Sequence, residues 1–299
     1  MPAALIISHG QPSDPAPAEA EIAALAARVQ ALMPDWHVAS ATLATKGALA
    51  EQVARAGAGG LAYPLFMADG WFTRDHLPQR LAEAGGADWH VLDPFGIDDG
   101  VQRLTVTLAQ EAAAARGLNP AETACLLAAH GSFRSPAPSR VANAMADRLK
   151  AEAGFARVEA AFIDQSPRIA EAAASFPNGA LVLPFFAAKG GHVVDDLPAA
   201  LAEAGFNGHL LEPVGLDPRA GDLAGVVADV FHLVRPEVLD AALVAAPAVD
   251  VVEHHALGQQ LGERLGHLDQ AQVAHHLGPE AGVQQVQDGV LDAADVLVH

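Results

Sequence analysis

The strongest constraint on the fold is an internal repeat, because the chain carries the same landmarks twice in the same order. Leu5–Gly10 (Leu-Ile-Ile-Ser-His-Gly) returns as Leu126–Gly131 (Leu-Leu-Ala-Ala-His-Gly), at an offset of 121 residues. Pro64–Phe66 returns as Pro184–Phe186, at an offset of 120. This order at a near-constant offset indicates a tandem duplication. The other paired landmarks are Pro15–Pro17 with Pro136–Pro138, Gly70, Asp75 and Leu77–Pro78 with Gly190, Asp195 and Leu197–Pro198, and Asp93–Gly96 with Glu212–Gly215.

Within each copy, short apolar runs alternate with longer segments that have a helical period. Strand–helix–strand alternation predicts a parallel sheet with helices on both of its faces. We therefore expect an α/β fold of two tandem-duplicated domains, each a parallel four-stranded sheet flanked by helices. The expected strands of the second copy are Cys125–Ala129, Val158–Ile163, Ala180–Phe186 and His209–Leu211; its expected helices are Pro138–Ala153, Pro167–Ala174 and Val194–Ala204, and Gly100–Arg116 and Leu216–Val234 close the two copies.

The repeat predicts domains at residues 1–117 and 118–235, followed by a low-complexity, His-rich tail at residues 236–299. The tail lacks Phe, Trp, Tyr and Ile but holds six of the fourteen histidines. We expect it to be loosely helical or disordered, because it has little material for a core of its own.

Charge and cysteine content exclude several classes of function. A formal net charge of −19 argues against a nucleic-acid partner or an anionic membrane surface. Cys125 is the one cysteine, which excludes an intramolecular disulfide and a cysteine-ligated iron–sulfur cluster. We find no signal peptide, no apolar run long enough to span a bilayer and no phosphate-binding glycine motif. We therefore expect a cytoplasmic protein.

Two histidines of the second copy follow apolar runs, at the expected carboxyl ends of parallel strands. His130 precedes Gly131, and His192 follows Lys189-Gly-Gly just ahead of a predicted helix. Open α/β sheets bind their ligands at this edge. Two converging imidazoles suit cobalt, nickel, ferrous iron or zinc, and each is also a base near neutral pH. The alternative is that each histidine only bonds a loop carbonyl.

The first copy serves as an internal control for these two positions. His9 matches His130, but Phe72 stands where His192 stands in the second copy. His76 aligns with an aspartate of the second copy, so it does not replace the missing histidine. Only the second copy is therefore expected to be active.

Two acidic positions have different interpretations. Asp75 and Asp195 match each other whether or not a second histidine is present, so we interpret this aspartate as a cap of the following helix. Asp164 ends a predicted strand and corresponds to Ala44 in the first copy. Its carboxylate could bind metal, direct a proton or cap the next helix.

Basic residues gather beside the two histidines of the second copy. Three cations there correspond to one neutral and two acidic residues in the first copy, a contrast of five charge units. This contrast favours an anionic ligand, although drift of surface charges is the alternative. The pairs are Arg134 with Ser13, Arg140 with Glu19 and Lys189 with Asp69.

A metal and a polyanion handled at one site resemble the class II tetrapyrrole chelatases, specifically the sirohydrochlorin cobaltochelatase (CbiX-type) family. The matching stretches are Leu126–Arg134 and Leu181–Pro198, and the resemblance spans about residues 3–235. It implies a chelatase-like fold that inserts a divalent metal into sirohydrochlorin or a related tetrapyrrole, in cobalamin or sirohaem biosynthesis. The metal, with cobalt as first choice and iron or nickel as alternatives, is then a substrate, and no organic cofactor or iron–sulfur cluster is expected.

The resemblance also assigns roles to particular residues. His130 and His192 would bind the metal and assist its insertion, with Asp164 as a third catalytic candidate. Arg134, Arg140, Lys189, Ser132, His9 and Phe72 would bind the anionic tetrapyrrole. The chain would be a monomer with an internal pseudo-dimer. The competing hypothesis is a non-catalytic protein that binds and delivers metal or tetrapyrrole.

Overall fold

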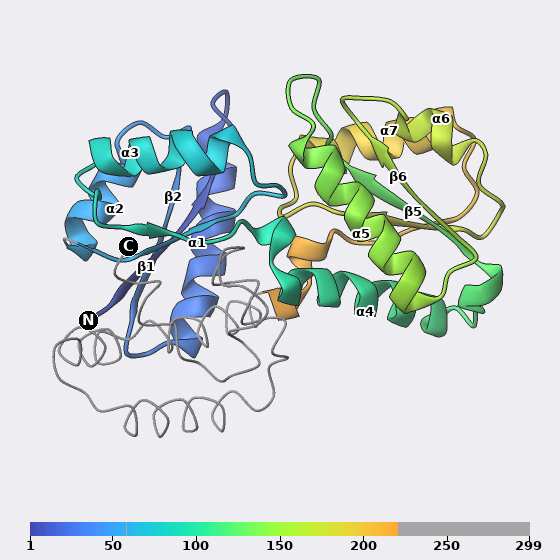
Figure 1. Ribbon diagram of the computed structural model, residues 1–299, viewed down its shortest axis with the longest axis horizontal. Helices are drawn as coiled ribbons and strands as arrows, with labels where there is room; N and C mark the ends of the chain where they lie inside the picture. Colours follow the sequence, from blue (N-terminus) through green and yellow to red (C-terminus); the bar gives the residue numbers. More distant parts are fainter. Residues whose placement is uncertain (58, 221–299) are drawn as a thin grey trace, which may run out of the picture. The chain divides into compact units, whose positions relative to one another are not determined.

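The structure is a computed structural model that describes residues 1–57 and 59–220 (Figure 1). It contains two four-stranded parallel sheets with equivalent strand orders, β2-β1-β3-β4 and β6-β5-β7-β8. The predicted duplicated α/β architecture is thereby confirmed. The first copy contributes β1 (Ala3–Ser8), α1 (Pro15–Leu32), β2 (His37–Thr42), α2 (Ala48–Ala56), β3 (Leu61–Pro64), the π-helix η1 (Phe72–His76), α3 (Leu77–Glu83), β4 (His90–Val91), the short 3₁₀ helix η2 (Phe95–Ile97) and α4 (Asp99–Ala115).

The second copy repeats this order after a short 3₁₀ helix. Its strands begin and end within one or two residues of the expected bounds. The predicted helix at Leu216–Val234 lies mostly outside the described residues. The tail at residues 236–299 lies wholly outside them. The second copy contributes η3 (Pro120–Glu122), β5 (Ala124–Ala129), α5 (Ala137–Ala153), β6 (Arg157–Phe162), α6 (Ile169–Ala173), β7 (Leu181–Pro184), the π-helix η4 (His192–Asp196), α7 (Leu197–Glu203), β8 (His209–Leu210) and the 3₁₀ helix η5 (Val214–Leu216).

The second strand in each sheet order, β1 or β5, is apolar apart from Ser8 at the end of β1, because helices cover both faces of the sheet. All six residues of β5, including Cys125, are buried. Residues that point to one face of the second sheet pack with α6 and α7, and α4 and α5 lie on the other face (Figure 1). Uninterrupted apolar strands are typical of parallel sheets buried on both sides.

Helix α4 belongs to the first copy in sequence but packs against the second copy. It contacts α5 and β7, and the Arg148 guanidinium of α5 lies 2.6 Å from Asp99 and 3.2 Å from Gln102. At its other end, Arg219 forms two hydrogen bonds with Glu111, at 2.9 and 2.7 Å. The predicted domain boundaries mark the sequence repeat, whereas this helix extends from one copy onto the other.

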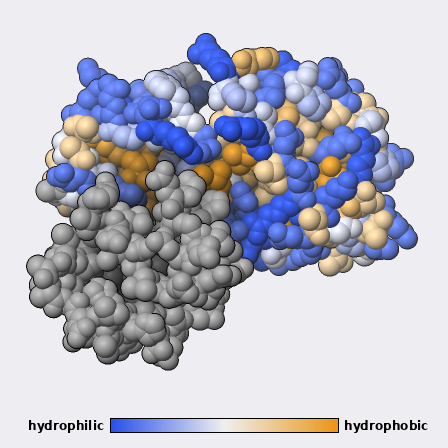
Figure 2. All heavy atoms as spheres, in the orientation of Figure 1, coloured by the Kyte–Doolittle hydropathy of each residue, from blue (hydrophilic) through white to orange (hydrophobic). Residues whose placement is uncertain are grey.

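Polar side chains gather on the surface, although 51% of the residues are hydrophobic. In the view of Figure 2, hydrophilic side chains cover much of the face that the described residues present, with apolar patches between them. Within the described ranges, none of the helices has the length and apolar character needed to cross a bilayer.

Candidate functional site

His130 is held at the end of β5 by a tight turn. The carbonyl of His130 accepts a hydrogen bond from Asp164 N at 2.9 Å, just beyond β6. Gly131 follows with a φ of +73°, and a Cβ there would lie 2.7 Å from the Gln165 side chain. Only glycine tolerates both the left-handed backbone and this close approach. The same geometry recurs at Gly10, after His9.

His192 lies at the start of a π-helical turn, two residues before the predicted helix start. The amide of Leu197 donates to the His192 carbonyl, five residues back. Pro198 follows and has no N–H for the regular α-helical pattern, which favours a change of pitch here. Single π-turns are frequent at functional sites. In this turn, His192 and Asp196 lie side by side.

The two histidines meet at their Nε2 atoms. His130 Nε2 lies 3.0 Å from His192 Nε2, and the rings are nearly perpendicular, at 83°. The Nδ1 atom of His130 lies 2.9 Å from the Gly131 carbonyl, and that of His192 lies 2.6 Å from the Asp196 carboxylate. A carbonyl and a carboxylate only accept hydrogen bonds, so the tautomer with the proton on Nδ1 satisfies both of these contacts. In that tautomer, the Nε2 lone pairs of both rings face the same space and could bind one cation.

Two lone pairs directed at one point could supply two of the four ligands of a tetrahedral metal site. Imidazole nitrogens bind zinc at about 2.0–2.1 Å, and a separation of 3.0 Å fits two adjacent positions around one ion. Over residues 1–57 and 59–220, no group of three or more His, Cys, Asp or Glu side chains is arranged to hold a metal. Structural metal sites use four protein ligands.

The aspartates differ from expectation. Asp164 Oδ2 lies 3.6 Å from His130 Nδ1, beside the imidazole but beyond hydrogen-bond distance. Asp195 forms no cap hydrogen bond with η4 or α7, but it lies in the first turn of η4, where its negative charge fits the N-terminal anion role. Sequence analysis missed Asp196, whose spacing of four residues from His192 was the available signal. Asp75 likewise gives no cap to η1 or α3.

The three cations near the pair are exposed and unpaired. Arg134 lies in the loop before α5, Arg140 in the first turn of α5 and Lys189 in the loop before η4. Within the described part of the chain, none of their side chains forms an ion pair or hydrogen bond. Their positive charge is therefore available to an anion. Lys189 is also fixed through its backbone, since its amide donates to Glu21 of α1 at 3.0 Å.

Ser132, an expected substrate contact, forms hydrogen bonds within the protein. The Ser132 hydroxyl accepts hydrogen bonds from the amides of Arg134 and Ser135, at 3.1 and 3.3 Å. Its own amide donates to Gln165 Oε1 at 2.8 Å. Ser132 and Gln165 thus shape the loop that carries Arg134. In the first copy, Glu19 accepts from the Thr42 amide at 3.2 Å and from its hydroxyl, so this carboxylate also serves the fold.

The equivalent point of the first copy holds rings instead of a histidine pair. His9 meets Phe72 edge-on, with ring centroids 5.4 Å apart. Burial, and secondarily the charge of His76, lower the pKa of His9 below its ordinary value. Phe72 also packs against Phe66 at 5.0 Å and against the first core. His76 stacks on Trp71, with centroids 5.1 Å apart.

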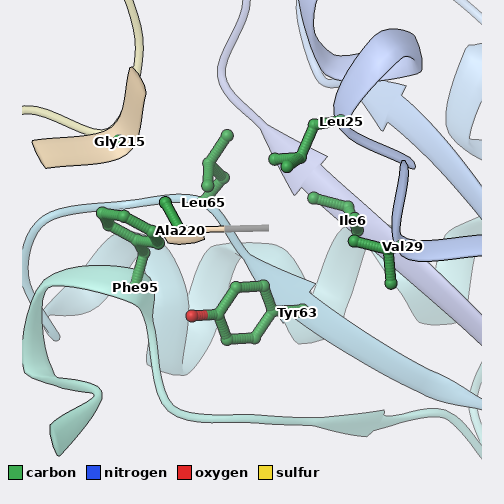
Figure 3. A pocket seen from close by; sticks show the side chains of 8 residues that line it. All are labelled: Ile6, Leu25, Val29, Tyr63, Leu65, Phe95, Gly215 and Ala220. Atoms are coloured by element: carbon green, nitrogen blue, oxygen red, sulfur yellow. The ribbon is translucent and has the colours of Figure 1, made fainter. Parts of the chain in front are cut away.

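Two cavities of the described chain lie away from the histidine pair. One, of about 10 Å³, has an apolar lining that includes Ile6, Val29 and Gly215, with the Tyr63 ring beside it (Figure 3). Burial is the first cause of the raised pKa of Tyr63. The other, of about 480 Å³, lies between α4 and the end of the second sheet. Neither of these two cavities is lined by His130 or His192.

Comparison with solved structures places the fold among chelatases. A structure of CbiX, described as the terminal enzyme for biosynthesis of siroheme in denitrifying bacteria, is 47% identical, with a TM-score of 0.70 over 76% of this chain and 98% of that chain. SirB from Bacillus subtilis with Fe³⁺ is 16% identical, with a TM-score of 0.60 over 74% of this chain and 92% of that chain, a likeness of fold alone.

Sequence comparison gives the family. A probable sirohydrochlorin cobaltochelatase of Halobacterium salinarum is 23% identical over 159 residues, 45% of this chain and 54% of that protein. The matched region therefore spans about half the length of that curated relative. The CbiX family model matches residues 3–112 and 124–226, which is well over half of the chain. On this match and on the duplicated fold, the chain belongs to the CbiX family.

Proposed function

We propose that this chain is a sirohydrochlorin chelatase that inserts a divalent metal ion into its tetrapyrrole substrate. Cobalt is the first choice, and iron and nickel are alternatives that imidazole ligands accept equally. The observation that carries the proposal is the pair of Nε2 atoms, 3.0 Å apart, whose rings are oriented by the Gly131 carbonyl and by Asp196. The names of the CbiX and Halobacterium relatives support the substrate class.

The metal substrate would first bind between His130 and His192. Since the protein supplies two nitrogen ligands, the remaining positions stay with water and are open to the nitrogens of the macrocycle. Ligand exchange can then proceed stepwise, with pyrrole nitrogens replacing water before the imidazoles release the ion. A site with four protein ligands would instead retain the metal.

The number of protons that insertion releases also favours a role for His130 and His192. Insertion of a divalent ion into a free-base tetrapyrrole releases the ion's ligands and two pyrrole protons. Each imidazole that lets go of the metal regains a free Nε2 lone pair, and two lone pairs match two protons. Asp164, whose Oδ2 lies 3.6 Å from His130 Nδ1, is the third catalytic candidate beside the pair. Solvent at this exposed edge then removes the protons.

The unpaired cations supply the substrate's anchors. Arg134, Arg140 and Lys189 would bind carboxylates of the macrocycle, because charge-assisted hydrogen bonds to carboxylates are among the strongest in proteins. His9 and Phe72 would meet the ring from the first copy. We further propose a cytoplasmic monomer whose two copies act as an internal pseudo-dimer, in cobalamin or sirohaem biosynthesis.

The test is an anaerobic insertion assay with metal-free sirohydrochlorin and Co²⁺, Fe²⁺, Ni²⁺ or Zn²⁺, followed by visible absorbance. We expect many turnovers per chain with at least one metal. His192→Ala should remove this activity, and His90→Ala, a substitution of an exposed histidine on β4, is the matched control. No acceleration above the protein-free rate with any metal contradicts the proposal.

The competing function is a non-catalytic carrier of metal or tetrapyrrole. A carrier would bind stoichiometric Co²⁺ or sirohydrochlorin and give no more than one product per chain. The same assay at limiting protein therefore separates the two functions. Turnover numbers well above one exclude the carrier.

A further inference from the structure

We infer that the first copy has become a ring-stacking platform for the flat, anionic macrocycle, with Trp71 as its exposed contact. The inference rests on the proposed function, because it takes a tetrapyrrole as the occupant. It assigns a binding role to Trp71 and His76, which lie beside Phe72, the counterpart of His192 in the first copy.

The platform is built at the positions that hold metal-binding groups in the second copy. Its members, Trp71, Phe72, His76 and His9, form one chain of ring contacts. Trp71 stacks on His76 with an interplanar angle of 21°, His76 lies 4.9 Å from Phe72, and Phe72 lies 5.4 Å from His9. The equivalent residues of the second copy are Gly191, His192, Asp196 and His130. One proposed metal ligand, His192, is thus replaced by the ring of Phe72, and Gly191 is replaced by the indole of Trp71.

Packing against the first core accounts for the positions of Phe66 and Phe72 but not for that of Trp71. Phe66 and Phe72 are half-buried against the first core, whereas Trp71 is 66% exposed and belongs to neither core. An exposed indole leaves a large apolar surface in water, which is costly without a partner. With His76 stacked against the ring, much of the rest of the indole stays open. A planar conjugated ligand that stacks on the indole would remove this apolar surface from water.

Trp71 also lies at the junction with the second copy. A Cβ on the neighbouring Gly70 would lie 3.5 Å from Ala137, the first residue of α5. Helix α5 follows directly from the loop that begins after His130 and carries Arg134. Figure 1 shows the segment between β3 and α3 reaching toward the second copy. One macrocycle can therefore stack on the platform while its carboxylates meet the unpaired cations.

The charges around the platform fit this division of roles. In the described residues, Arg74 of η1 is paired with Asp69, so the platform itself offers little free positive charge. The free cations Arg134, Arg140 and Lys189 all belong to the second copy. Stacking would thus come from the first copy and anion binding from the second.

The first experiment measures the solvent exposure of Trp71 with and without metal-free sirohydrochlorin, so its result does not depend on metal insertion. The chain has three tryptophans, and Trp36 and Trp89 are buried, at 5% and 6% exposed. Hydroxyl-radical footprinting by mass spectrometry should show Trp71 oxidation falling at least about threefold on saturation with the macrocycle. Leu32, 51% exposed at the end of α1 and at the amino edge of the sheet, should be unchanged. Unchanged oxidation of Trp71 overturns the inference.

Kinetics provide the second measurement. Trp71→Ala should raise the KM for sirohydrochlorin about tenfold with kcat within about twofold, as expected for the loss of one stacking contact. Trp71→Phe should recover most of the loss, and Leu32→Ala should match the wild type. A fall in kcat with unchanged KM, or no change at all, contradicts the platform. If no variant and no wild type inserts metal, the proposed function fails, while footprinting still decides whether Trp71 binds the macrocycle.

Discussion

Asp196 Oδ2 lies 2.6 Å from His192 Nδ1, and this contact determines which nitrogen of His192 faces His130. Free neutral imidazole can carry its proton on either nitrogen, so the carboxylate removes one source of disorder from the site. A carboxylate behind a metal-binding histidine also makes the imidazole a stronger ligand. The relationship makes Asp196 a positioning residue for the proposed chemistry.

We predict that Asp196→Ala lowers the Co²⁺ affinity about 10–100-fold, the usual effect of losing such a partner. Calorimetric titration with Co²⁺ measures the affinity, and ¹⁵N NMR of His192 measures the shift of the proton from Nδ1 toward Nε2. Asp195→Ala is the matched control, since Asp195 is a neighbouring exposed carboxylate without a contact to the histidine. Equal affinities in both variants would exclude the positioning role.

A second prediction concerns the asymmetry of the copies. His192→Ala should lower kcat/KM for metal insertion at least about 100-fold, because it removes a ligand and a base. Phe72→Ala should keep kcat and lower the free energy of unfolding by about 1–3 kcal/mol, since its ring packs against Phe66 and the first core. His9→Ala should slow turnover partially. Near-normal turnover in His192→Ala with an inactive His9→Ala would move the site to the first copy.

The third prediction tests the cations. Replacing Arg134, Arg140 and Lys189 together by Gln should raise the KM for sirohydrochlorin at least about tenfold and weaken its dependence on salt, because screened ionic contacts are lost. Steady-state kinetics at two NaCl concentrations measure both effects. Arg55→Gln is the control, since Arg55 pairs with Glu51 on α2. A triple variant with wild-type KM would refute anion binding here.

The fourth prediction is a pH dependence of stability from His9. Burial, then the charge of His76, lower its pKa in the folded chain, so the unfolded chain binds the proton more readily. The free energy of unfolding therefore falls as the pH drops from about 7.5 to about 5, through the ordinary histidine pKa. His9→Gln should lose less stability over this range than the wild type, as measured by urea midpoints. His76→Gln should reduce the loss in part, and parallel curves for all three would exclude His9 as the cause.

The fifth prediction concerns the tail, residues 236–299. A chain that ends at Arg235 should retain insertion activity with kcat within about twofold, since the matched family region ends at residue 226. The insertion assay on both chain lengths measures this. A shortened chain that folds normally by circular dichroism but loses most turnover would show that the tail takes part.

Sequence patterns predicted the strands and the two histidines because both depend on local order. Buried strands and the residues that follow them can be identified from apolar runs, and parallel order then brings His130 and His192 to one edge. Asp196 was not predicted, because it aligns with His76 in the first copy, whereas Asp195 aligns with another aspartate. The π-turn, which depends on the effect of Pro198 on the preceding backbone, changed the helix start.

Longer-range packing could not be predicted in the same way. The amphipathic pattern of α4 shows that one side is buried but does not identify the surface that covers it, and this surface belongs to the second copy. Ser132 has the same limitation, because its residue type fits both substrate binding and a loop hydrogen bond. In the structure Ser132 forms hydrogen bonds with Arg134, Ser135 and Gln165, and its contact with the substrate stays a prediction.

The placement of His192 opposite a phenylalanine in the other copy has an evolutionary consequence. In a homodimer of one copy, every substitution occurs twice, so a ring that replaces a metal ligand removes the ligand from both subunits. Fusion of the copies into one chain frees each half to accept its own substitutions. Phe72 and Trp71 can then coexist with His192 and Gly191 at equivalent positions. Selection can then act on each copy separately, whereas the two subunits of a symmetric homodimer must carry the same residues.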